Sequence, residues 1–132
     1  MIGGNHDYVL ADSPEKAGSL LSEAVYLRDS SVVISGMTIY GAPWQPVFSV
    51  HACDAFALPR GKALKEKWEM IPPGVDILVT HTPPLGILDH DGFIANGCSD
   101  LLETVAAIRP SYHVFGHIHD SHGLVQLGST RY

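Results

Sequence analysis

Runs of apolar residues alternate with polar turns along this chain and predict a mixed α/β fold. Two short β-branched runs, at 31–34 and 37–40, flank Ser35-Gly36, which is typical of a β-hairpin. Residues 75–80 and 112–115 are nearly continuous apolar runs, the pattern of strands buried on both faces. We therefore expect a hairpin followed by two strands from the interior of a sheet.

Three other stretches have helical spacing. Ser13 followed by Pro14 is typical of a helix start, and predicts one helix through Ala17, Leu20, Leu21 and Ala24. A second helix is expected over 61–69 and a third over 99–108, each ended by prolines. Residues 41–46 contain two prolines, which interrupt a strand ladder, so a loop is expected there.

Histidines follow both of the predicted interior strands. His81 comes directly after the strand at 75–80, and Gly116-His117-Ile118-His119 comes directly after the strand at 112–115. Strand, helix and strand at this spacing is a βαβ alternation, and such sheets bind ligands beyond the carboxyl ends of their strands. The two histidine sites are therefore expected at one edge of the sheet.

Composition narrows the class of protein. The 132 residues are 45% hydrophobic and 17% charged, enough apolar content for one core, so a single domain over 1–132 is expected. A net charge of −6 argues against a nucleic-acid surface, and no apolar run is long enough to span a membrane. Cys53 and Cys98 form no disulfide framework, which favours a reducing, cytoplasmic setting. The pair His51 and Cys53 has no partner pair at zinc-finger spacing.

Three polar motifs favour a metal-centred hydrolytic site. Gly116 can let His117 and His119 converge on one point, and neutral imidazole binds transition metals. Gly4-Asn5-His6-Asp7 offers an amide oxygen, a titratable imidazole and a carboxylate. Each motif alone is also compatible with an ordinary turn or helix cap. Their combination with His81 favours the metal site.

The order GNHD, then a lone strand-end histidine, then GHIH resembles the last three blocks of the calcineurin-like metallophosphoesterase signature. That signature contains D-x-H, G-D, G-N-H-[DE], H and G-H-x-H. The stretches 40–46, 57–61, 76–84 and 113–119 are similar to the metallophosphoesterase-domain-containing branch, which is related to cyclic-nucleotide phosphodiesterases. The resemblance implies a phosphoesterase that hydrolyses phosphodiesters such as cyclic nucleotides, small molecules rather than nucleic acid.

The resemblance also assigns roles. Asn5, His81 and His117 would hold the second of two divalent metal ions, which are Mn, Fe or Zn, and His119 would hold the first. His6 would hydrogen-bond the phosphate and assist the leaving oxygen, and Asp7 would fix the tautomer of His6. Trp44, in a proline-rich loop, is a candidate to stack on a nucleotide base; the alternative is that it packs in the core.

The D-x-H and G-D blocks are absent, since only three residues precede Gly4. The expectation is the C-terminal portion of the metallophosphoesterase β-sandwich, with mixed sheets flanked by helices but without its first strands. With those ligands missing, we expect one metal ion or none, and impaired catalysis. Asp89-His90-Asp91 is a weaker candidate replacement, because its Asp-Gly turn suits an exposed loop. The alternative function is a non-catalytic, regulatory fragment that binds a metal or nucleotide.

Overall fold

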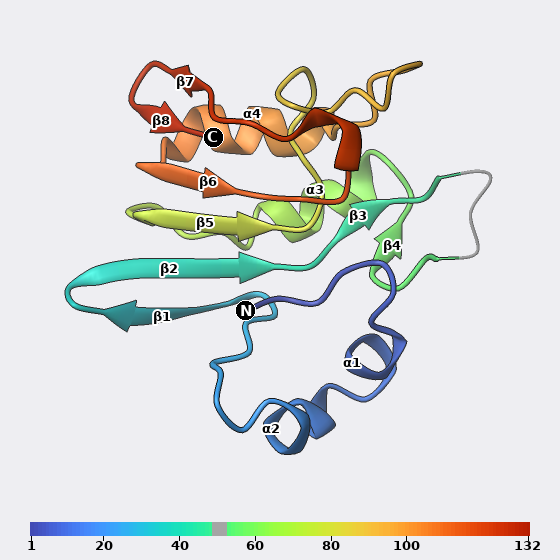
Figure 1. Ribbon diagram of the computed structural model, residues 1–132. Helices are drawn as coiled ribbons and strands as arrows, with labels where there is room; N and C mark the ends of the chain where they lie inside the picture. Colours follow the sequence, from blue (N-terminus) through green and yellow to red (C-terminus); the bar gives the residue numbers. More distant parts are fainter. Residues whose placement is uncertain (49–52) are drawn as a thin grey trace.

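The computed structural model describes residues 1–48 and 53–132 (Figure 1). His51 of the His-x-Cys pair lies outside the described residues. The elements run in the order α1 (Tyr8–Asp12), the 3-10 turn η1 (Pro14–Lys16), α2 (Ala17–Leu20), β1 (Ser30–Ile34), β2 (Met37–Ala42), β3 (Gln45–Pro46), β4 (Ala57–Leu58), α3 (Lys62–Trp68), β5 (Ile77–Thr80), α4 (Ser99–Ile108), β6 (Tyr112–Val114), the 3-10 turn η2 (His119–Ser121), β7 (Gln126–Leu127) and β8 (Thr130–Arg131).

A six-stranded mixed sheet has the order β1-β2-β5-β6-β8-β7, and β3 pairs with β4 in a separate two-stranded sheet. β2, β5, β6 and β8 run parallel, while β1 and β7 are antiparallel to their neighbours. The predicted α/β class, with mixed sheets flanked by helices, is confirmed (Figure 1). No helix in the described part of the chain has the length and apolar content needed to cross a membrane.

The predicted hairpin is present as β1 and β2. Ser35 and Gly36 have φ angles of 52° and 79°, and positive φ at both central residues is what a tight hairpin turn requires. The helices expected over 61–69 and 99–108 are confirmed as α3 and α4.

The prediction for residues 13–24 is wrong in its extent. The backbone at Ser13 leaves the helical region, with φ −138° and ψ 66°, so α1 ends at Asp12, and the Ser13 side chain makes no capping hydrogen bond. The helix that follows ends at Leu20, whose side chain is 58% exposed. Within α2 only Ala17 reaches the core, and Gly18 and Ser19 have low helix propensity. Nothing therefore sustains a longer helix here.

The loop expected over 41–46 is also wrong in part, because Gly41 and Ala42 complete β2 and residues 45–46 form β3. The Gln45 N–H donates to the carbonyl of Phe56 (3.1 Å), and the Val47 N–H donates to the carbonyl of Leu58 (3.0 Å). Pro46 lies between these two donors. Its missing N–H points away from the ladder, which is how proline is accommodated at a sheet edge.

The core lies on one face of the large sheet. Leu78 of β5 packs in one cluster with Leu64 and Trp68 of α3 and with Leu101 and Val105 of α4, and all five side chains are fully buried. In Figure 1 both helices lie behind the sheet.

The opposite face has much less cover. Ile77 and Val79 are only half-buried there, and their registered neighbours Tyr112 and Val114 are exposed. The prediction that these strands are buried on both faces is therefore wrong. Helices cover one face, and an apolar run in the sequence does not say how many faces are covered.

Candidate functional site

The carboxyl ends of β5 and β6 place His81 and His117 side by side. Val79 of β5 is registered with Val114 of β6, so both strands reach the same sheet edge. The Gly116 N–H donates to the carbonyl of His81 (3.2 Å), which joins the two strand ends. The two imidazole rings lie edge to face with centroids 4.7 Å apart. The edge predicted from the βαβ alternation is confirmed.

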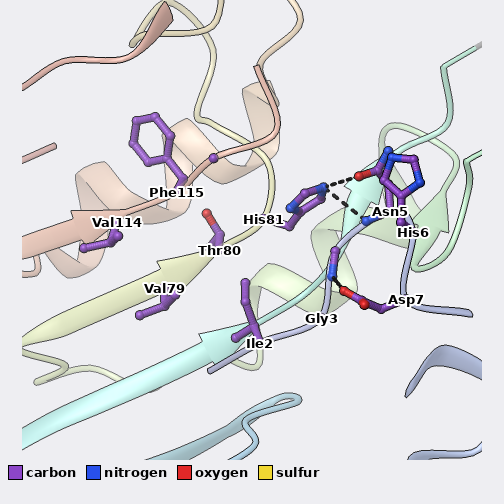
Figure 2. A pocket seen from close by; sticks show the side chains of 12 residues that line it. Ile2, Gly3, Asn5, His6, Asp7, Val79, Thr80, His81, Val114 and Phe115 are labelled. Carbon is purple, nitrogen blue, oxygen red and sulfur yellow. Dashed lines mark hydrogen bonds between the residues drawn. The ribbon is translucent and has the colours of Figure 1, made fainter. Parts of the chain in front are cut away.

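The N-terminal turn reaches the same edge from the other end of the chain (Figure 2). The Gly4 N–H donates to Oδ2 of Asp7 (2.7 Å), and the Asp7 N–H donates to the carbonyl of Gly4 (3.0 Å). A Cβ at Gly4 would lie 2.9 Å from Cε1 of His81, too close for any larger residue without displacement. The absence of a side chain at Gly4 therefore allows Asn5 to reach His81.

Asn5 and His81 meet through one imidazole nitrogen. Nε2 of His81 lies 3.2 Å from the backbone N of Asn5 and 3.0 Å from its side-chain oxygen Oδ1, as Figure 2 shows. Nε2 accepts from the N–H only when it carries no proton, and donates to Oδ1 only when it does. With Oδ1 of Asn5 turned toward Nε2, only one of the two contacts can be a hydrogen bond at a time: with Nε2 unprotonated, two lone pairs face each other. A cation between them would relieve this.

Burial keeps His81 neutral. Desolvation and, to a smaller extent, the nearby His117 lower its pKa from 6.5 to about 4, whereas Asp7 opposes the shift. His6 and His119 also lower the pKa of His81, so both lie near this imidazole. A neutral imidazole is the form that binds a metal ion.

His117 has a strained backbone. Its φ is 71°, and the Ile118 N–H donates to the carbonyl of Gly116 (2.9 Å), which closes a tight three-residue turn around it. This γ-turn conformation is rare and costly for a residue with a side chain. Strain of this kind concentrates at functional sites, where surrounding structure holds a side chain in one direction.

His6 and His119 are exposed, His6 in the N-terminal turn and His119 at the start of η2. Asp7 accepts the Gly4 N–H, which gives this carboxylate a structural function in the turn. Its suggested effect on the tautomer of His6 stays a prediction.

Two cavities meet at Asn5 and His6. One, of about 420 Å³, is lined by residues 2–7 together with 79–81 and 114–116. The other, of about 390 Å³, includes His117 and is closed by Asp91 and Asn96. The sequence analysis did not predict that Asn96 lines this cavity. Asp91 was considered only as a replacement ligand, and its carboxylate accepts N–H bonds from Phe93 and Ile94 of its own loop.

Trp44 lies elsewhere. Its side chain is 8% exposed, its indole N–H donates to Oδ1 of Asp29 (2.6 Å), and the Lys67 ammonium lies 4.2 Å from the ring centroid. It lines neither of the two cavities at Asn5. Stacking on a base stays a prediction, and the structure does not bring Trp44 to the histidines.

Among the described residues, no group of three or more histidine, cysteine, aspartate or glutamate side chains is arranged to hold a metal ion. The cluster at the sheet edge instead combines two imidazoles with an amide. Both cysteines are free.

The sequence of the chain was compared with family models and with the sequences of known proteins. No family model matches the chain. Over 121 residues it is 50% identical to the human protein named metallophosphoesterase domain-containing protein 1, an alignment that covers 89% of this chain and 36% of that protein. A UPF0046 protein of Caenorhabditis elegans is 49% identical over 121 residues, covering 88% of this chain and 29% of the relative.

Solved structures share the fold. One superposes with a TM-score of 0.71 at 15% identity, over 98% of this chain and 54% of the other. The TT1561 protein of Thermus thermophilus superposes with a TM-score of 0.59 at 17% identity, over 98% of this chain and 59% of the other. At such low identity these matches show a common architecture only.

The sequence similarity shows which proteins this chain is related to. The chain is a homologue of the metallophosphoesterase domain-containing proteins and of the UPF0046 proteins. It spans about a third of the length of these two relatives.

Proposed function

We propose that the chain forms a metal site of a metal-dependent phosphoesterase that acts on a small phosphodiester, such as a cyclic nucleotide, in the cytoplasm. The observation that carries the proposal is the meeting of Asn5, His81 and His117 at one sheet edge from three separate segments. The similarity to metallophosphoesterase domain-containing protein 1 supports the same class of chemistry.

The donor atoms fit a divalent cation. Two neighbouring ligands of an octahedral ion, each about 2.1 Å from the metal and at right angles, are about 3.0 Å apart. Oδ1 of Asn5 and Nε2 of His81 have a separation of 3.0 Å. Amide oxygen with neutral imidazole suits Zn, Fe or Mn. Asn5, His81 and His117 would hold the ion, which supplies charge neutralisation at the phosphate and a more acidic bound water.

The remaining polar side chains would bind and orient the substrate. His6 is exposed beside Asn5 and lines both cavities, so its imidazole can reach a phosphate oxygen and give a proton to the leaving oxygen. Asp7 holds the turn through Gly4 and thereby fixes the direction of Asn5 and His6. His119, at the start of η2 and two residues after His117, would be a ligand of the other ion, the first of the two.

A second candidate is a binding or regulatory domain without catalysis. The specific observation in its favour is that Asn5, His81 and His117 include no carboxylate. Neutral donors bind zinc better than Mn²⁺ or Mg²⁺, which prefer anionic oxygen. A single weak zinc site would then bind a phosphate or nucleotide without hydrolysing it.

Metal titration and turnover on the same sample test both proposals. Zn²⁺ and Mn²⁺ binding is measured by calorimetry, and hydrolysis with bis(p-nitrophenyl) phosphate. His81→Ala and His117→Ala should each weaken metal binding by about tenfold or more, as expected for loss of a ligand. His6→Ala should leave metal binding unchanged and lower turnover. His122→Ala, at an exposed histidine that lines neither cavity, is the matched control.

The results of these titrations and turnover assays separate the assigned metal ligands from the proposed catalysis. Equal loss of metal binding in the three site variants, or in none of them, would contradict the assigned ligands. Metal binding that depends on His81 and His117 without turnover would support the binding domain over the phosphoesterase.

A further inference from the structure

The imidazole of His117 is in contact with rings from two other segments of the chain. Its centroid lies 4.7 Å from that of His81 and 5.1 Å from that of Phe48, and the planes of the Phe48 and His117 rings differ by 34°. The backbone of His117 has a φ of 71°, a conformation that persists only where the surrounding structure holds it. Phe48 has no atom that binds a metal ion, so its contact with His117 acts through packing.

Pairing between β3 and β4 fixes the position of Phe48. The two strands are parallel, with Pro46 beside Leu58, and the Val47 N–H donates to the carbonyl of Leu58 (3.0 Å). Continuing this register by two residues sets Phe48 beside Arg60. The guanidinium carbon of Arg60 indeed lies over the Phe48 ring, 5.8 Å from its centroid. Backbone pairing therefore places this ring next to a cation.

The guanidinium of Arg60 is fixed in turn by the loop that follows β5. Its two terminal nitrogens donate to the carbonyls of Gly97 (2.8 Å) and Asn96 (3.1 Å). The same loop is held by Asp89, a buried carboxylate whose Oδ2 accepts the Gly97 N–H (3.0 Å). A planar guanidinium that donates to two fixed carbonyls has little freedom to move. Its cation–π contact therefore helps to hold the Phe48 ring in one place.

We propose that Phe48 and Arg60 are positioning residues for His117, with Arg60 acting through the Phe48 ring. The inference rests on the proposed function, because it needs His117 to be a metal ligand. Groups that orient a metal-bound imidazole typically change metal affinity by about 10- to 100-fold when they are replaced. Phe48 also lines the cavity of about 390 Å³ that includes His117. The experiment must therefore separate positioning from direct contact between Phe48 and the substrate.

Zinc titration by calorimetry tests the role of the ring. Phe48→Leu keeps an apolar side chain but removes the flat ring, and it should weaken zinc binding by about tenfold. Phe48→Tyr keeps the ring and should bind zinc as the wild type does. Phe93→Leu is the matched control, because Phe93 is 90% exposed and lines neither cavity at Asn5. Unchanged zinc affinity in Phe48→Leu would overturn the proposal, and a raised KM in that variant would then make Phe48 a substrate contact.

A double-mutant cycle tests whether Arg60 acts through Phe48. Arg60→Met keeps a long apolar side chain without the charge, and in the wild type it should weaken zinc binding by about threefold. In the Phe48→Leu protein the same change should have no further effect, because the ring that the guanidinium holds is gone. Equal losses in the two backgrounds would refute the action of Arg60 through the ring.

NMR spectra of the metal-free proteins separate the positioning of His117 from metal binding itself. The imidazole resonances of His117, assigned by comparison with His117→Ala, should show one ring orientation in the wild type and in Phe48→Tyr. They should show more than one orientation in Phe48→Leu. A single orientation in all three proteins would refute the positioning role. A wild type that binds no zinc would instead overturn the proposed function, and the imidazole spectra would still decide the role of Phe48.

Discussion

Replacing His113 by phenylalanine should make the protein more resistant to acid. His113 is buried in the middle of β6 and lies outside the cluster of Asn5, His81 and His117. The Thr80 hydroxyl donates to the carbonyl of Thr82 (2.8 Å), so it accepts from Nε2–H of His113 (2.8 Å). Nδ1 is then an unprotonated acceptor, and no hydrogen-bond partner for it is found among the described residues.

Burial lowers the pKa of His113 from 6.5 to about 3. As pH falls below 6.5, the unfolded chain takes up a proton at this residue and the folded chain does not, so stability is lost as pH falls. The loss attributable to His113 is about 2 kcal/mol at pH 5, and it is nearly absent above pH 7. Below pH 3 the native imidazole also titrates and the loss levels off.

Urea unfolding of the wild type and of His113→Phe, at pH 5 and pH 7.5, measures this effect. Phenylalanine keeps the ring that packs against Phe115 at a centroid distance of 5.0 Å and leaves the Thr80 donor bond in place. We expect similar stability at pH 7.5 and an advantage for the variant of about 2 kcal/mol at pH 5. His81 is present in both proteins, so its own titration cancels. A difference in unfolding free energy that does not change with pH would refute the reasoning.

Three further substitutions test the site and the core. Gly4→Ala should displace the His81 ring and weaken zinc binding in calorimetry by about tenfold, while Gly18→Ala, which has open space around it, should not; equal affinities would contradict the close approach at Gly4. His117→Gly should raise the unfolding free energy by about 1 kcal/mol through relief of the positive φ. It should also weaken zinc binding by about tenfold or more, as His117→Ala does. A destabilised variant would show that the turn carries no strain. Trp44→Phe should lower the unfolding free energy by about 1–2 kcal/mol by removing the bond to Asp29, with zinc affinity unchanged; a loss of zinc binding would place the indole at the site after all.

The sequence by itself determined the strand ends. Apolar runs followed by His81 and by Gly116-His117 predicted two adjacent parallel strands, and the carboxyl ends of such strands meet at one edge whatever surrounds them. The hairpin at Ser35-Gly36 was equally predictable, because a local backbone requirement selects those residues. Both predictions depend on chain neighbours alone.

Only the tertiary structure decided which distant segments complete the site. Asn5 and His81 are 76 positions apart, and they meet because Gly4 has no side chain to hold the turn away from the imidazole. The same holds for burial: an apolar pattern cannot say whether α3 and α4 cover one face of the sheet or both. Covering layers and close approaches come from packing between segments, and a single chain pattern contains no information about the partner that packs against it.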